Sequence, residues 1–322
     1  KQLCSQAEAE KELHLHKAHG ALLVASCEPN FPRMLRAIDD CPPLISVMGN
    51  LALADRHTIA VVGARNASAN GWRFAEALAR DLGKSGVICV SGLARGIDGA
   101  VHRATLDTGT IAVVAGGINT IYPAEHKSLY EDIIRRGLVI AETPFGKKPV
   151  TSSFLRRNRI IAGLSYATVV VEAGEASGSL TTARHALEQG REVFAVPGSP
   201  FDPRSVGSNN LIREGATLTT SAKDILDNVH FVSNVLPFTF REPNDTILTP
   251  TVIYPDEALL DSMRPKLFEK LGPTPVTIDD IITQLNTSPS IVLTLLLELE
   301  LAGRIERYAG NKVALVYEQT AD

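Results

Sequence analysis

Three of four consecutive residues near the middle of the chain are arginines, and an aromatic residue precedes them. The segment runs Phe154, Leu155, Arg156, Arg157, Asn158 and Arg159. Guanidinium groups clamp phosphates, and a neighbouring ring offers a face for a nucleobase, which is what sequence-tolerant binding to single strands requires. The arginines could instead pair within the protein, with Glu142 and Glu172 as the candidate partners.

Two glycine-containing turns follow apolar segments. The first carries Gly63 and Arg65, and the second spans residues 91–98. Small residues let backbone amides approach an anion closely, so both turns are candidate phosphate sites, although a purely structural turn would look the same. We interpret Asp98 as an orienting or capping group, not an acid catalyst. The candidates in the second turn are Ser91, Gly92, Arg95, Gly96 and Asp98.

A glycine- and serine-rich loop precedes a helical pattern at 179–189. It supplies Gly178, Ser179 and Thr182, and amides and hydroxyls at a helix N-terminus form an anion site or a structural cap. Residues 197–200 and 207–210 are interpreted as loops at the same edge. These loops either line the candidate anion site or only reverse the direction of the chain.

A histidine group near the N-terminus suggests a metal site at first sight. His14, His16 and His19 do not share one helical face, however, so we predict no metal. The four cysteines lie at wide, unpatterned spacings, which indicates reduced thiols and neither a zinc site nor a disulfide framework. We expect no cofactor.

The composition is that of a globular protein. Its net charge of −4 implies that any polyanion site is a local basic cluster and not a basic coat. No apolar run approaches the roughly 18 residues of a membrane span, and no signal peptide is visible, so we expect a cytoplasmic protein. The chain does not begin with Met, and a leading domain could have been removed.

Six apolar runs alternate with helical patterns, which predicts a Rossmann-like, doubly wound, mostly parallel α/β sheet. Their richness in Val and Ile is typical of strands buried on both faces. Ligands of such sheets bind beyond the carboxyl ends of the strands, where Arg65 would lie. The six runs are 58–62, 87–90, 111–115, 138–141, 167–171 and 192–196.

The pattern divides the chain into four parts. Residues 1–50 form an N-terminal segment that leads onto the sheet, and 51–230 form the Rossmann-like core. Residues 231–256 carry four prolines without periodicity and indicate a linker. Residues 257–322 predict a winged helix, from three helices followed by a hairpin. Its elements are expected at 257–271, 278–285, 290–301, 304–308 and 312–317.

Several segments resemble, in order, the motifs of the bacterial DNA-processing protein A (DprA/Smf) family. They include VVGAR, SGLARGID, FLRRNRIIAGLS and GSNNLIREGA, and the resemblance covers about residues 20–220. It implies a dimerising Rossmann-like core that binds and protects incoming single-stranded DNA in natural transformation and helps to load the RecA recombinase. It also implies DNA contacts at Arg65, the 91–98 loop, Lys127, Phe154 and residues 156–159.

The chain departs from the family pattern at two positions, and neither change removes a charge. Phe31 stands where the family usually has Tyr, and Leu155 where it often has Pro. The winged helix matches in pattern only. Its 290–301 helix is apolar and acidic, with Glu298 and Glu300, which suits contact with a protein better than contact with phosphate.

The alternative function is a nucleotide or nucleotide-sugar enzyme of the phosphoribohydrolase type. Such enzymes carry a PGGxGTxxE-like motif with a catalytic Glu, but residues 180–183 are Leu, Thr, Thr and Ala, so we predict a protein that is not an enzyme. A pure scaffold would explain the fold but not the arginines.

We expect a homodimer, because two units side by side double the track of phosphate contacts. The interface is expected among Leu211, Ile212, Leu218 and Ile225.

Overall fold

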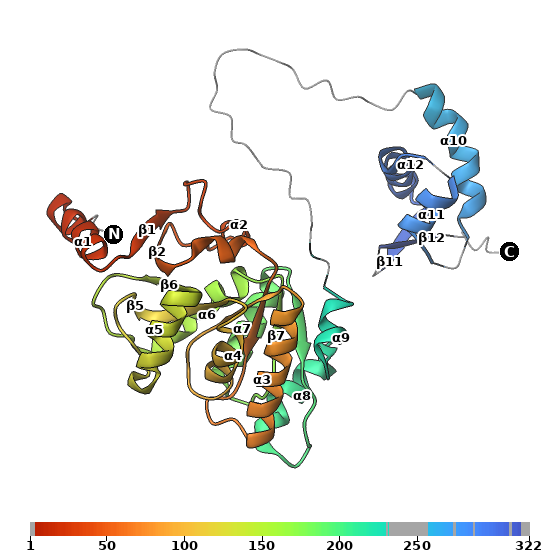
Figure 1. Ribbon diagram of the computed structural model, residues 1–322. Helices are drawn as coiled ribbons and strands as arrows, with labels where there is room; N and C mark the ends of the chain where they lie inside the picture. Colours follow the sequence, from red (N-terminus) through yellow and green to blue (C-terminus); the bar gives the residue numbers. More distant parts are fainter. Residues whose placement is uncertain are drawn as a thin grey trace. The chain divides into compact units, whose positions relative to one another are not determined.

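A computed structural model of the 322-residue chain describes residues 4–229, 231, 257–272, 275–285, 287–308 and 311–316. The chain divides into two compact units, one within residues 1–236 and the other within 237–322 (Figure 1). Apart from residue 231, the predicted linker lies outside the described residues.

The first unit is built on one nine-stranded sheet with the order β1-β2-β6-β5-β4-β3-β7-β8-β9. The strands from β6 to β9 in that order run parallel, and β1 and β2 pair antiparallel at one edge. The six predicted runs are β3 to β8, so the doubly wound prediction is confirmed. The strands are Leu22–Ala25, Leu44–Gly49, Thr58–Val62, Ile88–Ser91, Thr110–Gly117, Leu138–Thr143, Ala167–Val170, Glu192–Ala195 and Thr217–Leu218.

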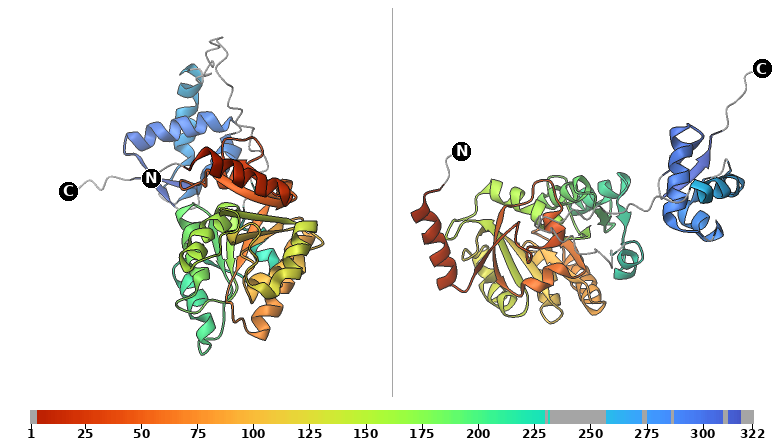
Figure 2. Two further views of the ribbon diagram at one scale, coloured as in Figure 1. Left: turned by 90° about the vertical axis from the view of Figure 1, so that its left-hand side faces the viewer. Right: turned by 90° about the horizontal axis from the view of Figure 1, so that it is seen from above.

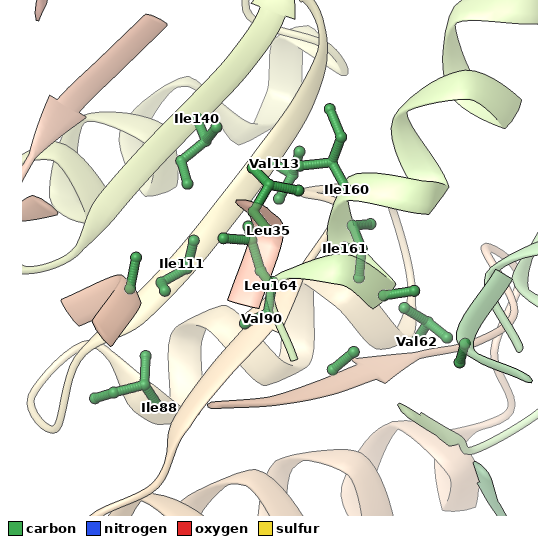
Figure 3. Close-up of a cluster of buried hydrophobic side chains, with 14 of the residues drawn as sticks. Leu35, Val62, Ile88, Val90, Ile111, Val113, Ile140, Ile160, Ile161 and Leu164 are labelled. Carbon is green, nitrogen blue, oxygen red and sulfur yellow. The ribbon is translucent and has the colours of Figure 1, made fainter. Parts of the chain in front are cut away.

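Helices cover both faces of this sheet (Figure 2). Side chains alternate between the faces along each strand. In β3, Val62 packs with Ile160 and Ile161 on one side (Figure 3), in the cluster that also includes Ala60, while Ile59 and Val61 belong to a separate cluster on the other side. The helices are α1 Gln6–Ala18, α2 Arg33–Arg36, α3 Ala69–Lys84, α4 Ile97–Thr105, α5 Lys127–Arg136, α6 Thr151–Gly163, α7 Gly178–Glu188, α8 Val206–Arg213 and α9 Ala222–Leu226.

The N-terminal residues contribute directly to the sheet. β2 pairs with β6, with Val47 opposite Ile140, and β1 pairs with β2. The α1 helix is tied to β2 by a hydrogen bond of 2.7 Å between His16 Nε2 and Ser46 Oγ. His16 is thus a buried structural residue.

Residues 207–210 lie in α8, so the prediction of a loop there is wrong. The first turn of α8 packs against the residues that follow β7. The Gly207 amide donates to Ala173 O at 2.7 Å, and a Cβ on Gly207 would meet Ala173 O and Gly174 O at 2.8 Å. Gly207 therefore permits close packing of a helix and does not turn the chain.

The second unit is the predicted winged helix. Three helices pack around one apolar cluster, and a three-stranded sheet has the order β10-β12-β11. The predicted helices and hairpin are confirmed within the described residues. The elements are α10 Glu257–Lys270, β10 Val276–Thr277, α11 Ile278–Leu285, α12 Pro289–Leu301, β11 Ile305–Tyr308 and β12 Lys312–Leu315.

Candidate nucleic-acid interface

A cleft of about 660 Å³ opens at the carboxyl ends of β3 and β7. The sheet reverses its strand order between these two strands, and open α/β sheets bind ligands at such a point. Residues from four separate predicted motifs meet there, because parallel strands end at the same edge. The predicted residues that line the cleft are Gly63, Arg65, Asp98, Phe154, Arg157, Asn158, Gly178, Ser179 and Thr182.

An aromatic pair and a cation form one wall of the cleft. The guanidinium carbon of Arg65 lies 5.0 Å from the centre of the Phe154 ring, and the Tyr122 ring lies 5.3 Å from the same centre. Arg65 is exposed, and no ion pair found among the described residues involves it. We missed Tyr122 in the sequence, although it stands in a loop beyond a predicted strand, as the other candidates do.

Arg157 is buried at the base of the cleft, where the protein itself uses its hydrogen bonds. It donates to Gly92 O at 2.6 Å and to Val113 O. Burial lowers the pKa of Arg157 to about 10, opposed by the negative charge of Asp98. Burial also raises the pKa of Asp98, opposed mainly by Arg157. Arg157 therefore supplies a positive field at the cleft while holding the 91–98 loop in place.

Asp98 acts as the orienting group that we expected. Its Oδ2 accepts the backbone amides of Gly92 at 3.1 Å and Ala94 at 3.3 Å. These bonds fold the 91–98 loop back onto the start of α4.

Two glycines let the β3 and β4 turns touch. Gly96 has a φ of +72°, and a Cβ there would lie 2.2 Å from Ala64 O. A Cβ on Gly63 would lie 2.6 Å from Ile97 Cγ1. The two predicted phosphate loops are thus one packed unit.

Four predicted contacts in the 91–98 loop, among them the Gly96 described above, lie away from the cleft lining. Ser91 is fully buried, and its hydroxyl donates to Val61 O at 2.7 Å. Gly92 is buried against the Arg157 guanidinium. Arg95 is exposed but forms two hydrogen bonds of 2.7 Å with Glu125. The expectation that Ser91 and Gly92 face a ligand is corrected, because both are enclosed by the sheet and α6.

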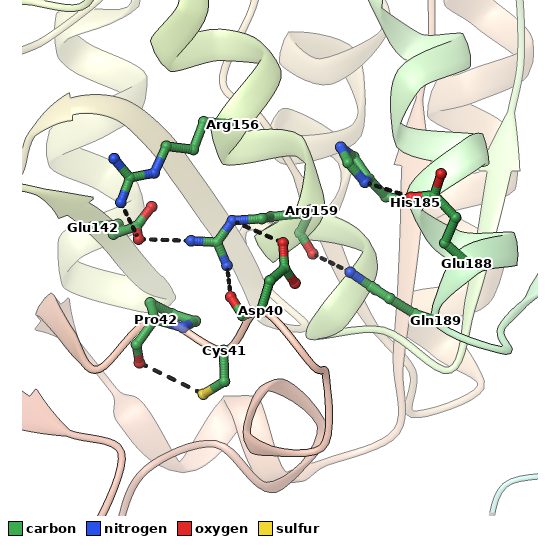
Figure 4. Close-up of polar contacts among 9 residues, drawn as sticks. All are labelled: Asp40, Cys41, Pro42, Glu142, Arg156, Arg159, His185, Glu188 and Gln189. Carbon is green, nitrogen blue, oxygen red and sulfur yellow. Dashed lines mark hydrogen bonds and ion pairs between the residues drawn. The ribbon is translucent and has the colours of Figure 1, made fainter.

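The arginines of α6 serve different places: Arg157 lies at the base of the cleft, whereas Arg156 and Arg159 both turn to Glu142 (Figure 4). Arg159 is only 8% exposed and pairs with Glu142 at 2.6 Å and Asp40 at 3.4 Å. Arg156 is exposed and pairs with the same Glu142 at 2.7 Å. Neither lines the cleft. The alternative of pairing within the protein is therefore correct for both, with Glu142 as the partner.

The other candidate partner of the arginines has a different role. Glu172 accepts the backbone amide of Ser68 at 2.9 Å and is also bonded to the Ser68 hydroxyl. It thereby ties the end of β7 to the start of α3.

The start of α7 forms the opposite wall of the cleft. Ser177 caps the helix by accepting the Ser179 amide at 3.4 Å, and Asn158 Nδ2 donates to Gly178 O at 3.0 Å. Thr182 is buried but lines the cleft, one turn further along. The positive end of the α7 helix dipole thus lies in the lining of the cleft that Arg65 also lines.

Lys127 is exposed at the first residue of α5 and does not line the cleft.

A family model described as DNA recombination-mediator protein A matches residues 22–230, and a DprA winged helix domain model matches residues 254–311. The chain belongs to the DNA recombination-mediator protein A family. It is 40% identical to Protein Smf of Escherichia coli over 88% of this chain and 75% of that protein. It is also 40% identical to DNA processing protein DprA of Bacillus subtilis, over 67% and 74% of the two chains.

Solved structures of the DNA recombination-mediator protein A family share the fold. The X-ray structure of DprA from Streptococcus pneumoniae has a TM-score of 0.66 at 39% identity and covers 71% of this chain and 79% of its own. A structure of DNA processing protein A from Helicobacter pylori, reported for its single-stranded DNA binding mode, has a TM-score of 0.60 at 27% identity and covers 65% and 97%.

The predicted dimer residues do not form one surface on this family member. Leu211 and Ile225 are buried in the core clusters on opposite faces of the sheet, and Ile212 is partly buried. Only Leu218, on the edge strand β9, is half exposed. The prediction of a four-residue interface is therefore wrong, because α8 and α9 turn their apolar sides toward the sheet.

None of the helices in the described part of the chain is long and apolar enough to cross a membrane.

Proposed function

We propose that the cleft binds single-stranded DNA and that the chain acts as a recombination mediator which helps to load a RecA-type recombinase in natural transformation. Arg65 contacts a phosphate, and Phe154 with Tyr122 offers ring faces to the bases. A chain of net charge −4 can bind a polyanion in this way because the exposed guanidinium of Arg65 and the buried one of Arg157 both lie in the lining of the cleft.

The observation that carries this proposal is the contact between Arg65 and Phe154. Guanidinium and ring lie 5.0 Å apart on the wall of the cleft, and Arg65 has no carboxylate partner among the described residues. Arg156 and Arg159, by contrast, are neutralised by Glu142. Arg65 is therefore the exposed cation in the cleft lining that is available to an external phosphate.

The cleft offers little support for the alternative enzyme. Asp98 is the one carboxylate among its lining residues, all of which lie in the described part of the chain. Its Oδ2 already accepts two backbone amides, so it is held in a structural role. We propose a binding protein without catalytic activity.

We propose that the winged helix contacts a protein and not DNA. The outer side of α12 exposes Leu293, Leu297 and Leu301, and the Leu301 side chain is 80% exposed. Glu298 and Glu300 on the same helix pair with Arg264 and Arg307. An apolar stripe flanked by acids that are already paired suits a protein partner such as the recombinase better than a phosphate backbone.

We also propose that the protein works as a homodimer in the cytoplasm, joined through β9. This strand ends the sheet, so its outer backbone groups are open to pairing, and Leu218 adds an exposed apolar side chain.

The binding proposal is tested by the salt dependence of oligo(dT) affinity. Each phosphate contact on a single strand contributes about −0.7 to the slope of log K against log salt. We expect Arg65→Ala to weaken binding and to make the slope shallower by about 0.7.

Arg156→Ala is the matched control, since Arg156 is also an exposed arginine but lies off the cleft and is paired with Glu142. It should leave the slope unchanged. Equal slopes for wild type and Arg65→Ala, or a change confined to Arg156→Ala, would show that the cleft is not the phosphate site.

A further inference from the structure

The loop between β8 and α8 holds a phenylalanine almost wholly in solvent. Phe201 is 96% exposed, the highest value among the large hydrophobic side chains that the structure describes. The loop begins at the carboxyl end of β8, which is the edge of the sheet where the cleft opens. An aromatic ring in this position is free to receive another flat ring.

The loop is held firmly, so Phe201 is presented at a defined place. Gly198 and Asn209 form reciprocal hydrogen bonds of 3.1 and 3.0 Å, and the Phe201 amide donates to Ser199 Oγ at 3.3 Å. A Cβ on Gly198 would meet Ser205 Oγ at 2.0 Å, so the loop is also tightly packed at its base.

The same loop borders the cleft. A Cβ on Gly174, which lines the cleft, would lie 3.4 Å from Pro203 O, two residues beyond Phe201. β7 and β8 are paired neighbours, and adjacent strands are about 4.8 Å apart. A nucleic-acid strand that leaves the cleft past the end of β7 therefore has only the width of one β-strand to cross before it reaches the Phe201 loop.

The charges of the loop do not oppose a phosphate backbone. Asp202 is bound by Arg204 through two hydrogen bonds of 2.9 and 2.8 Å, so the two opposite charges lie together beside Phe201. The exposed ring thus stands beside an internally neutralised pair.

We propose that Phe201 is a second base-stacking position, which takes a nucleobase of the strand after it leaves the cleft across the ends of β7 and β8. This inference rests on the proposed function and deepens it, because it gives the bound strand a direction and a longer site. Stacking on one ring is tolerant of base identity, so the position lengthens the site without adding sequence preference.

The test compares full-length wild type, Phe201→Ala and Phe201→Trp in binding an oligo(dT) series that lengthens by one nucleotide at a time. The shortest ligands fill the cleft alone and should bind all three proteins equally. Beyond a threshold length, Phe201→Ala should bind about tenfold more weakly than wild type, and Phe201→Trp should match wild type.

The Phe201→Trp variant also gives a fluorescence signal from the position itself. The natural chain has one tryptophan, Trp72, so the wild-type emission provides the baseline that is subtracted. The emission of the introduced indole should be quenched only by ligands longer than the threshold, because a stacked base quenches it and a shorter ligand does not reach it.

Leu187→Ala is the matched control. Leu187 is also an exposed apolar side chain, at 59%, but it lies near the C-terminal end of α7, whereas the cleft lies at the start of that helix. It should bind every length as wild type does. Circular dichroism checks that each variant is folded.

The outcomes separate the two proposals. Equal affinity of wild type and Phe201→Ala at every length, or an introduced indole whose emission no ligand changes, overturns the second stacking position and leaves the cleft intact. A wild-type protein that binds no oligonucleotide overturns the proposed function and the stacking position together.

Discussion

A single buried histidine in α4 links the stability of the core to pH. His102 Nδ1 lies 2.8 Å from Thr110 Oγ1, and Nε2 has no hydrogen-bond partner among the described residues. Burial, reinforced by the charges of His126 and Arg157, lowers its pKa to about 3. An unfolded imidazole titrates near about 6.5, so below that pH the unfolded chain binds a proton that the folded chain excludes. Stability is therefore lost as pH falls from about 6.5 towards 3.

We expect His102→Asn to flatten this dependence, because an amide can replace the hydrogen bond to Thr110 but cannot take up a proton. The wild type should lose up to about 1.4 kcal/mol of unfolding free energy per pH unit between about pH 6 and 4 from this residue. Urea unfolding of both proteins across that range measures the difference. Parallel curves would mean that His102 is not the group responsible.

The arginines show which parts of the site could be predicted from residue types. Arg65 and Phe154 were found because cations and aromatics after buried strands are recognisable by type. Glu142 is a predicted partner of Arg159, but the second partner, Asp40, is not predicted, since it lies 119 residues earlier in the chain. Burial of a helical side chain depends on what packs against the helix, and a local sequence pattern does not contain that information.

At the scale of elements, the site depends on contact between the turn after β3 and the turn after β4. That contact is possible because Gly96 has no side chain. We expect Gly96→Ala to cost more than about 3 kcal/mol of unfolding free energy, since its φ of +72° is combined with a collision between Cβ and Ala64 O. Gly146→Ala is the control, because its φ of +75° is similar but no atom lies within 4 Å. It should cost about 1 kcal/mol. The unfolding free energies are measured by chemical denaturation. A similar loss in Gly96→Ala and Gly146→Ala would mean that the close approach of Gly96 to Ala64 does not matter for stability.

The strands and helices differed in how well the sequence predicted them. β3 to β8 are Val- and Ile-rich because they are buried on both faces, which makes them visible without any knowledge of their neighbours. β9 has only two residues, Thr217 and Leu218, and is too short to show a period. α8 has the Gly, Ser and Asn content of a loop, and its helical form depends on its packing against the end of β7.

At the scale of the whole molecule, the two edges of the sheet allow a direct test of the dimer. We expect Leu218→Glu on β9 to give a folded monomer in sedimentation. Its oligonucleotide affinity should be lower by about tenfold or more, because a monomer offers one cleft to the strand and a dimer offers two. Leu22→Glu on the opposite edge strand β1 is the control, since Leu22 is 60% exposed in a similar setting. If only Leu22→Glu dissociates the protein, the interface lies at the other edge.

The strand order also determines when, during synthesis, the growing chain can complete the sheet. β3 lies in the middle of the sheet, yet its partner β7 comes much later, and the Thr58 hydroxyl bonds to Leu164 O across 106 residues. The ribosome adds about 5–20 residues per second, so one edge of β3 stays unpaired for several seconds before β7 has been synthesised. During that interval an apolar strand with open backbone groups is exposed, so early folding of this protein is the stage most vulnerable to aggregation and most dependent on chaperones.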